Sequence, residues 1–378
     1  GRKLTKADRM IAPESETELA EALAGARSPL AVRGGATRSG AADGAEVLST
    51  AGLSGVALYE PGALTLVAGA GTPLAEIEAL LAGEGQRLAF EPMDHRGLLG
   101  TDGAPTIGGV VAANVSGPRR VAVGAARDFM LGVRFVDGAG HAVKNGGRVM
   151  KNVTGYDLVR LMTGSRGRLG VLSEVSLKVL PAPETQGMIV FEGLDLARAV
   201  AAMSAALGSP YEVTGAAHDP STGRTLLRIE GFETQVAYRL DRLADRLADY
   251  GQPETVRDAE EVAEAWRALR DVAPLQGAAG DVWRIHCRPS AAPELAARLA
   301  PERLLVDWGG GLLWALLPEG ADARARLGAF DGHATRVRGA PVPGVPALPP
   351  EPAAVAALTA GLKARFDPRG ILNPDLEA

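Results

Sequence analysis

Residues 30–40 join an apolar run to residue types that can bind an anion. The segment reads LAVRGGATRSG, so a predicted strand ends in Arg33, a glycine pair, small and hydroxyl residues and a second arginine, Arg38. Small residues let a loop turn several backbone N–H groups toward one point, and the arginines add positive charge. Taken alone, the residues favour an anion-binding loop and an ordinary glycine turn about equally.

A second segment, residues 100–120, joins small side chains to amide and hydroxyl groups. It reads GTDGAPTIGGVVAANVSGPRR and includes Asn114, Ser116 and Gly117. Small side chains allow a flat ligand to lie against the backbone, and amide and hydroxyl groups can then bond to its polar edge. The other interpretation is a tightly packed glycine-rich core. Such a core would need many positive-φ turns, whose entropy cost no bound ligand would offset.

The familiar nucleotide-binding fingerprints do not fit this chain. The closest dinucleotide candidate, GAGTPL at 69–74, has Leu74 where the third glycine should stand, and no glycine–lysine–hydroxyl ending of a P-loop is present. If these segments bind a nucleotide, the binding loop is therefore of neither the Rossmann nor the P-loop type.

The composition narrows the class of protein. The 378 residues are enough for two domains, and 46% hydrophobic with 22% charged residues is typical of a soluble globular protein. The formal net charge of −5 gives no general attraction to nucleic acid or to an anionic membrane. Cys287 is the single cysteine, which excludes an internal disulfide and an internal CxxC metal or iron–sulfur site. No apolar run reaches the roughly 20 residues of a spanning helix, and the first residues lack the apolar core of a signal peptide.

The hydrophobic pattern predicts short strands and helices in the first half of the chain. Residues 72–82 form an amphipathic helix with Thr72 as its N-cap and with Leu74, Ile77 and Leu81 on one face. Residues 91–128 instead consist of turns and very short runs, and so long an irregular stretch in a compact domain is usually functional. Further elements are expected at 14–25 (helix), 29–33 and 63–68 (strands), 131–143 (hairpin) and 171–180 (strand).

From residue 187 the pattern changes to strands that alternate with longer helices. The helix expected from residue 233 places Val236, Leu240 and Leu243 on one face. Such a pattern predicts an α+β layer in which helices cover one face of a largely antiparallel sheet. A proline-rich linker at 341–350 leads to a final helix at 352–366. We therefore expect domain boundaries that give 1–185, 186–345 and 346–378, the last returning to the first domain.

Four segments in this order resemble the FAD-binding domain of the vanillyl-alcohol-oxidase/PCMH flavoprotein superfamily: 30–40, 100–120, 126–140 and 146–181. Within it, SGPRR, ARDFMLGV, GGRVMKNVTGYDL, LGVLSEVSLKVLP and the C-terminal FDPRGILNP are similar to the GlcE family, the FAD-binding subunits of bacterial glycolate oxidase (glycolate dehydrogenase). The resemblance is strong over 14–185 and 350–376. Between these ranges it is weak and depends on the position of the segment in the chain and on the WRI element around Trp283. It implies an α+β protein: a PCMH-type FAD-binding domain of two subdomains and a ferredoxin-like α+β cap domain with an antiparallel sheet.

The resemblance also implies where FAD would lie. The loop 33–39 would hold the pyrophosphate through backbone N–H groups, and the segment with Asn114 would face the ribityl chain or the ring. The segment from Gly167 would contact the adenosine end, and Asn373 would approach the isoalloxazine. The full set of implied FAD-binding residues is Arg33, Gly34, Gly35, Ala36, Thr37, Arg38, Ser39, Pro92, Asp94, Thr106, Gly108, Gly109, Asn114, Ser116, Gly117, Arg127, Asp128, Gly167, Gly170, Val171 and Asn373.

The histidines argue for non-covalent FAD and against a metal site. Relatives with covalent flavin need a histidine or cysteine at the ring, and none of the five histidines falls in the 30–40 loop. His95 is close in sequence to the expected ring region, although a lone histidine is more often a hydrogen-bonding surface residue. The chain has no HxH pair or histidine cluster of the kind that metal-dependent catalytic subunits of this superfamily carry. We interpret His286 as a core or edge residue and Cys287 as a small buried side chain.

Oxidation of a 2-hydroxy acid by a flavin requires a cation for the carboxylate, a base for the hydroxyl proton and an α-hydrogen that faces flavin N5. The cation candidates are Arg119, Arg120 and Arg127. The candidates for the base are Lys151 and Tyr156. For Arg127 a charge partner of the cofactor phosphates or a surface side chain is the favoured interpretation, and for the others the two interpretations are even.

The resemblance therefore implies an FAD-dependent oxidoreductase subunit of a glycolate (2-hydroxy acid) dehydrogenase. It would pass electrons from substrate through the flavin to a histidine-bearing FAD subunit of the GlcD type and an iron–sulfur subunit of the GlcF type. Two alternatives stay open: a non-catalytic, FAD-containing assembly or electron-relay subunit, and a stand-alone flavin oxidoreductase of the same superfamily. We expect a cytoplasmic protein, free or peripheral at the inner face of the membrane through its complex, with no nucleic-acid partner.

Overall fold

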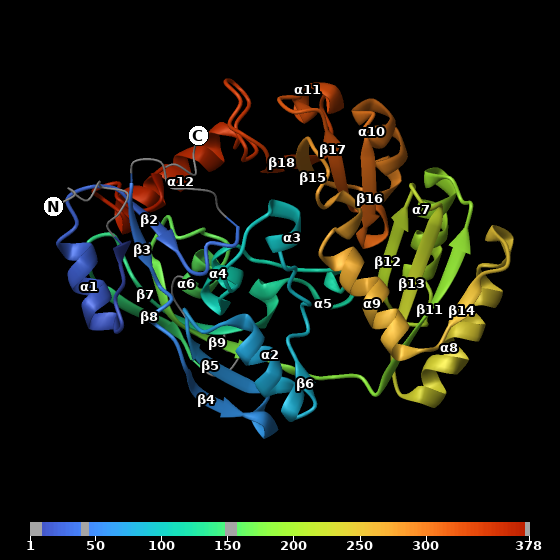
Figure 1. Ribbon diagram of the computed structural model, residues 1–378, viewed down its shortest axis with the longest axis horizontal. Helices are drawn as coiled ribbons and strands as arrows, with labels where there is room; N and C mark the ends of the chain where they lie inside the picture. Colours follow the sequence, from blue (N-terminus) through green and yellow to red (C-terminus); the bar gives the residue numbers. More distant parts are fainter. Residues whose placement is uncertain (1–9, 39–44, 148–156, 375–378) are drawn as a thin grey trace.

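The computed structural model describes residues 10–38, 45–147 and 157–374, and Figure 1 shows two sheet-containing parts side by side. The first part opens with a small parallel sheet in the order β1-β3-β2. Helix α1 (Glu16–Ala24) packs its Leu19 and Leu23 on this sheet, and Ser15 caps the helix by accepting a hydrogen bond from the Glu18 amide. The three strands are β1 (Met10–Ile11), β2 (Leu30–Arg33) and β3 (Glu46–Ser49).

A five-stranded antiparallel sheet in the order β4-β5-β9-β7-β8 forms the centre of the first part. The hairpin expected at 131–143 is confirmed. Strands β7 and β8 are antiparallel neighbours, and their pairing begins with Val136 opposite Ala142 at the turn. The strand expected at 171–180 is also confirmed as β9, which lies between β5 and β7. The strands are β4 (Val56–Glu60), β5 (Thr65–Gly69), β7 (Met130–Val136), β8 (Ala142–Gly146) and β9 (Val171–Lys178), and helix α6 (Leu158–Met162) packs on β7.

Helix α2 (Leu74–Gly83) buries Leu74, Ile77 and Leu81 as the pattern predicts. The expected N-cap was wrong: the helix starts one residue later, with Pro73 at the cap position and no side-chain hydrogen bond there. The Thr72 hydroxyl is fully buried and donates to the Gly69 carbonyl at 2.7 Å instead, while it accepts from the Gly55 amide at 2.9 Å. Thr72 therefore joins two loops rather than ending a helix.

The stretch from 91 to 128 contains three short helices among its turns: α3 (Arg96–Leu99), α4 (Ile107–Ala112) and α5 (Arg120–Val123). Each has one or two turns, too few for a hydrophobic period to show in the sequence. Thr106 caps α4 by accepting a hydrogen bond from the Gly109 amide at 3.2 Å, and α4 packs on β5 and β9. Just before this stretch, β6 (Gln86–Arg87) pairs with β10 (Leu180–Pro181), where the chain leaves the first part.

The second part contains one antiparallel sheet in the order β14-β11-β13-β12-β16-β17-β15-β18. It is built from two consecutive βαββαβ units of ferredoxin-like strand order, which meet where His218 pairs with Val306. The expected ferredoxin-like antiparallel sheet is thus present twice. The first unit is β11 (Thr185–Glu192), α7 (Leu196–Leu207), β12 (Val213–Asp219), β13 (Arg224–Gly231), α8 (Glu233–Arg246) and β14 (Glu254–Val256). The second is β15 (Asp281–Cys287), α10 (Ala292–Leu299), β16 (Arg303–Asp307), β17 (Leu312–Leu317), α11 (Ala323–Leu327) and β18 (Gly332–Arg338).

Different elements cover the two faces of this sheet. Helices α7, α8, α10 and α11 pack on one face, against side chains such as Trp283, Ile285 and Val306. Helix α9 (Ala259–Arg270) and the first part of the chain cover the other, where Leu305 and Trp314 belong to the same core as residues of the five-stranded sheet. Within the described ranges, no helix is long and apolar enough to cross a membrane.

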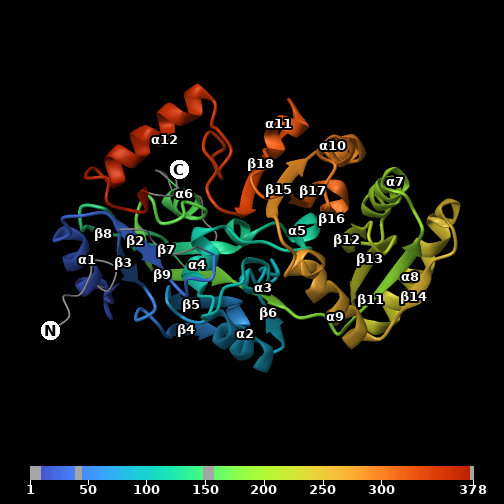
Figure 2. The same ribbon diagram turned by 45° about the horizontal axis from the view of Figure 1, so that its top comes forward.

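The C-terminal segment returns to the first part, as Figure 2 shows for α12 (Ala353–Phe366). Beyond the helix, Leu372 pairs with Leu30 of β2, and the Asn373 amide donates to the Leu30 carbonyl at 3.0 Å. Lys363 fixes the returning chain by donating to the Leu372 and Arg168 carbonyls. The end of the chain is therefore held beside the loop that follows β2.

Candidate functional site

A cavity of about 520 Å³ lies between the two parts of the molecule. The loop after β2, the start of α4 and two later segments, 112–117 and 166–172, form one side. The inner face of strands β15 to β18 forms the other side, with Arg284, Asp307 and Trp314 among its residues. Residues from five distant stretches of the sequence thus meet at one site, which is the usual place for a cofactor.

Most of the residues expected to bind the cofactor line this cavity. They come from both of the glycine-rich segments and from the C-terminal return, so the fold brings together what the sequence holds apart. The expected residues in the lining are Arg33, Gly34, Gly35, Ala36, Thr37, Arg38, Gly108, Gly109, Asn114, Ser116, Gly117, Gly167, Gly170, Val171 and Asn373. Ser39, which was expected to continue this loop, lies outside the described residues.

The glycine pair in the loop after β2 serves close packing rather than a left-handed turn. A Cβ atom on Gly35 would lie 1.7 Å from the Ala104 carbonyl oxygen, and one on Gly34 would lie 2.4 Å from Thr106 Oγ1. The left-handed residue is Ala36, with φ of 55°. The loop therefore needs glycines because it is pressed against residues 104–106, and this contact holds its backbone at the cavity wall.

The Asn373 side chain lines the cavity and connects two of the segments that form its wall. Its Oδ1 accepts a hydrogen bond from the Val32 amide at 2.7 Å, and its Nδ2 donates to the Arg166 carbonyl at 2.8 Å. A Cβ on Gly167 would lie 2.8 Å from the same Nδ2. Asn373 is therefore a neighbour of Gly167. The expected positions of Gly167 at the adenosine end and of Asn373 at the isoalloxazine stay predictions.

Five of the expected residues do not line the cavity and stabilise its walls instead. Asp94 pairs with Arg96, which lowers the pKa of its carboxyl group despite partial burial. Thr106 caps α4, Asp128 accepts from the Ala125 amide at 2.8 Å, and Pro92 is buried. Arg127 donates to the Thr163 carbonyl at 3.1 Å, and its own amide donates to Asn114 Oδ1 at 2.9 Å. The Arg127 contact with Asn114 fixes segment 112–117, and a direct role of these five residues in FAD binding stays a prediction.

The expected catalytic arginines differ in their surroundings. Arg119 is buried, donates to the Ala89 carbonyl at 2.8 Å and forms an ion pair with Glu230 of β13, so its contacts are structural. Arg120 lies with its guanidinium 4.6 Å from the ring centre of Trp308, which lines the cavity. Burial lowers the pKa of Arg120. Lys151 and Tyr156 lie outside the described residues, so their expected role as a base stays a prediction.

Six arginines are among the described residues that line the cavity, and of these Arg166 and Arg284 were not expected. Arg38, Arg166 and Arg284 all line it, and none has a carboxylate within ion-pair distance among the described residues. Burial lowers the pKa of Arg38 to about 10 and that of Arg284 to about 10, so both stay charged at neutral pH. Burial also lowers the pKa of Arg166, with Arg168 adding to the effect. A buried group of positive charges without partners favours a polyanionic ligand.

His95 is the histidine among the described lining residues. Burial lowers its pKa to about 3, with the charges of Arg38 and Arg284 acting in the same direction, so the imidazole is neutral. Its Nδ1 is buried without a hydrogen-bond partner in the described part of the chain. The sequence interpretation of His95 as a surface residue was therefore wrong, because its side chain lines the cavity with Nδ1 buried.

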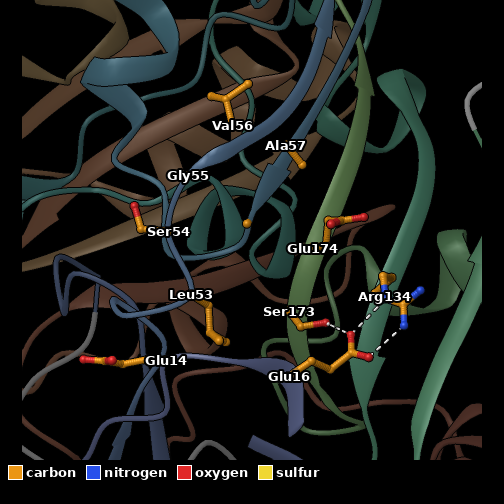
Figure 3. Close-up of a pocket in the computed structure, with 11 residues that line it drawn as sticks. Glu14, Glu16, Leu53, Ser54, Gly55, Val56, Ala57, Arg134, Ser173 and Glu174 are labelled. Atoms are coloured by element: carbon orange, nitrogen blue, oxygen red, sulfur yellow. Dashed lines mark hydrogen bonds and ion pairs between the residues drawn. The ribbon is translucent and has the colours of Figure 1, made fainter. Parts of the chain in front are cut away.

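A second hollow lies on the outside of the first part, at the edge where β4 begins near α1 (Figure 3). Two of its charged groups pair with each other: Glu16 accepts from Arg134 at 2.8 and 2.9 Å, and also from the Ser173 hydroxyl at 2.7 Å. These bonds lower the pKa of Glu16. The other charged groups of the hollow are Glu14 and Glu174, so it lacks the excess of positive charge found in the cavity between the two parts.

Comparison with known proteins agrees with this arrangement. The family described as "FAD binding domain" matches residues 7–146. The glycolate oxidase subunit GlcE of Escherichia coli (strain K12) is 36% identical over 323 residues, which cover 85% of this chain and 83% of that protein. The chain belongs to the GlcE family of glycolate oxidase subunits. It is an FAD-linked oxidoreductase subunit, as the resemblance implied.

More distant relatives share parts of the chain or its fold. The glycolate oxidase subunit GlcD of Bacillus subtilis (strain 168) is 39% identical over 94 residues, 24% of this chain and 20% of that protein. A solved structure of alkyldihydroxyacetonephosphate synthase superposes with a TM-score of 0.66 over 96% of this chain and 75% of that one, at 15% identity. At that identity the likeness concerns the fold alone, an FAD-binding domain with an antiparallel-sheet domain.

The cavity of this GlcE-family chain has features that fit FAD. Arg38 Nε is buried with no hydrogen-bond partner in the described part of the chain, which leaves a donor for a phosphate oxygen. A Cβ on Gly109 would lie 2.8 Å from the Arg38 guanidinium, so glycine at 109 makes room for that arginine. In the described lining, small residues at 34–36, 108–109 and 112–117 leave the backbone accessible to a flat ring system.

Proposed function

We propose that this chain is the FAD-binding subunit of a glycolate (2-hydroxy acid) dehydrogenase complex, with FAD held non-covalently in the cavity between its two parts. The observation that carries the proposal is the group of arginines in that cavity, Arg38, Arg166 and Arg284, which lack carboxylate partners among the described residues. They supply the charge that a diphosphate and a substrate carboxylate require. When bound, FAD supplies the acceptor for the two electrons of the substrate.

The chain's own residues would divide the work along the cavity. The loop 33–38, pressed against residues 104–106, would hold the pyrophosphate through its amides and Arg38. Segment 112–117 would lie along the ribityl chain and ring, with Arg127 fixing Asn114 from behind. Closure by the eight-stranded sheet would exclude water from the reacting atoms.

Electrons would then leave through partner subunits. The GlcE relationship supports a complex with a GlcD-type FAD subunit, and the single cysteine of this chain cannot build an iron–sulfur site of its own. We therefore propose that a GlcF-type iron–sulfur subunit receives the electrons. The complex would be cytoplasmic or attached to the inner face of the membrane through a partner.

A second candidate is a non-catalytic FAD-containing assembly or electron-relay subunit. In the described residues no group of three or more His, Cys, Asp or Glu is arranged to hold a metal ion, and the resemblance places the metal-dependent site in another subunit. This observation favours a chain that relays electrons or shapes the complex. A stand-alone reductase would differ from both by oxidising NADPH.

Anaerobic reduction of the purified, FAD-loaded chain separates these functions. Glycolate should bleach the flavin of the isolated chain if it is catalytic. A flavin that stays oxidised with glycolate alone but is reduced when the GlcD-type subunit is added would assign the chain to electron relay. Bleaching by NADPH would indicate a stand-alone reductase, and purification without FAD under all conditions would contradict every one of these functions.

A further inference from the structure

The second βαββαβ unit directs alternate side chains of neighbouring strands into the cavity. Arg284 of β15 pairs in register with Trp314 of β17, and Trp314 pairs with Leu305 of β16, two residues before Asp307. Because strand side chains alternate, Asp307 and Arg284 lie on the same face of the sheet. Val306, which lies between Leu305 and Asp307 on β16, belongs to the core on the opposite face of the sheet. Two ionisable groups are therefore built into the cavity wall by the strand register.

Arg284 lies within cation–π distance of two indoles. Its guanidinium carbon lies 5.2 Å from the ring centre of Trp308 and 5.5 Å from that of Trp314. No carboxylate lies within ion-pair distance of it among the described residues, although part of its surface faces the cavity. A cation–π contact does not use the N–H groups of a guanidinium, and their fork matches the two oxygens of a carboxylate.

The Asp307 carboxyl group is held in place by the backbone of Trp308. Its Oδ1 accepts a hydrogen bond from the Trp308 amide at 2.7 Å, and no other hydrogen bond reaches this carboxyl group in the described part of the chain. Trp308 has φ of 51°, and its indole Nε1 donates to the Gly117 carbonyl at 3.1 Å. Trp308 thus ties Asp307 to segment 112–117, which is expected along the flavin. The second carboxyl oxygen of Asp307, Oδ2, accepts no hydrogen bond in the described part of the chain.

The charges around Asp307 come from three elements. Glu91 lies on the first part, Arg228 on β13 and Arg284 on β15. Burial raises the pKa of Asp307 to about 7; Glu91 adds to the increase, while the Trp308 amide hydrogen bond and the two arginines oppose it. Such a group changes between acid and base close to neutral pH, as a proton acceptor in catalysis must.

We propose that Arg284 and Asp307 form the substrate end of the cavity, where Arg284 binds the carboxylate of a 2-hydroxy acid and Asp307 accepts its hydroxyl proton. The inference rests on the proposed function, because it takes FAD as the electron acceptor. The O–H bond breaks and its proton moves to Asp307; the α-C–H bond breaks and its hydrogen leaves with two electrons to the flavin. The C–O bond becomes a carbonyl, which gives the 2-oxo acid.

Binding of oxalate to the FAD-loaded chain tests Arg284 without any turnover. Oxalate carries the carboxylate but no hydrogen to transfer, and its binding can be followed through the flavin spectrum and the fluorescence of the flanking tryptophans. The variant Arg284→Gln should retain FAD and weaken oxalate binding by roughly 10- to 100-fold, the loss expected for a charge-assisted pair. Arg288→Gln, at an exposed ion pair just beyond the same strand, is the matched control and should bind oxalate like the unmodified chain.

Asp307→Asn tests the proton acceptor with a side chain of the same shape. It should keep FAD and bind oxalate within about threefold, but should slow anaerobic flavin reduction by glycolate by about 10²- to 10⁴-fold. The unmodified chain should reduce faster as pH rises through about 7, since the carboxylate form accepts the proton, and the variant should lose this dependence. If Asp307→Asn fails to retain FAD, Asp307→Glu keeps the carboxylate and should preserve the pH profile at a reduced rate.

The outcomes distinguish this inference from the proposed function. Two results would overturn the inference and leave FAD binding intact. In the first, the FAD-loaded chain binds oxalate equally well with and without the Arg284 side chain. In the second, the FAD-loaded chain does not bind oxalate at all. If Arg284→Gln loses FAD, Arg284→Lys replaces it. Lysine retains the positive charge but not the paired N–H donors of arginine, so the affinity of this variant for oxalate should be intermediate. A chain that never binds FAD contradicts the proposed function itself.

Discussion

Arg228 on β13 donates two hydrogen bonds to Glu91, at 2.8 and 2.9 Å, and so joins the eight-stranded sheet to the FAD-binding part of the chain. Glu230, two residues further along the same strand, pairs with Arg87 and Arg119 from that part. Arg228, Arg119 and Glu230 are buried, with a Glu230 side-chain exposure of 6%, while Glu91 and Arg87 are partly exposed. The cavity lies between the two parts, so this ion-pair network sets the distance between its walls.

We predict that Glu230→Gln destabilises the protein by about 3–5 kcal/mol, because it leaves buried arginines without a counter-charge. Urea unfolding measures the loss. Asp241→Asn is the matched control, since Asp241 pairs with Arg257 at the surface with both side chains more than half exposed. It should cost less than about 1 kcal/mol. Equal losses in the two variants would show that the network is not a structural link.

The same carboxylate predicts how stability depends on pH. Burial alone would raise the pKa of Glu230, but Arg228, Arg119 and Arg87 outweigh it and lower the pKa to about 2. A lowered folded-state pKa stabilises the protein above the unfolded-state value and loses that contribution as pH falls toward the folded-state value. The stability difference between the unmodified chain and Glu230→Gln should therefore be constant near neutral pH and shrink below about pH 4.5. A difference that already shrinks near pH 6 would mean that another group titrates.

The elements that could be predicted from the sequence are those with a long hydrophobic period. Helix α8 buries Val236, Leu240 and Leu243 as expected, since three turns suffice to show the stripe. Strand β9 was also expected, because alternation over eight residues ends at two prolines. Thr72 was misplaced because a hydroxyl before a helix can bond to the preceding loop as readily as to the helix, and local sequence does not distinguish the two.

The candidate site could be predicted only on its FAD-binding side. Loop 33–38 and Asn114 belong to motifs that are continuous in sequence, whereas Arg284 and Asp307 meet through the register of β15, β17 and β16. A single sequence contains no direct signal for that register. Arg284 stood within the WRI element around Trp283, but only the alternation of the strand shows that Arg284 faces the cavity while Trp283 faces the helices. The division of the chain at 185 and 345 stays a prediction.

We predict that FAD dissociates from this protein on denaturation. Precipitation with trichloroacetic acid should leave all the flavin in the supernatant and a colourless pellet, because His95 is the one histidine among the described lining residues and no cysteine is among them. His95→Ala is the control and should release flavin in the same way. A yellow pellet from the unmodified chain that turns colourless in His95→Ala would instead place a covalent bond at that residue.

The strongest test of the cofactor loop is one added carbon atom. In Gly35→Ala the new Cβ would lie 1.7 Å from the Ala104 carbonyl oxygen, a distance that no side-chain rotation relieves because both partners are backbone. The loop must then move off residues 104–106, and its amides and Arg38 move with it. We expect the purified variant to lose most of its bound FAD, measured as flavin absorbance per chain, while circular dichroism shows that both sheets still form. Gly62→Ala is the matched control, since a Cβ there has no neighbour within 4 Å, and it should retain FAD fully. Full FAD occupancy in Gly35→Ala would show that the phosphates bind elsewhere in the cavity.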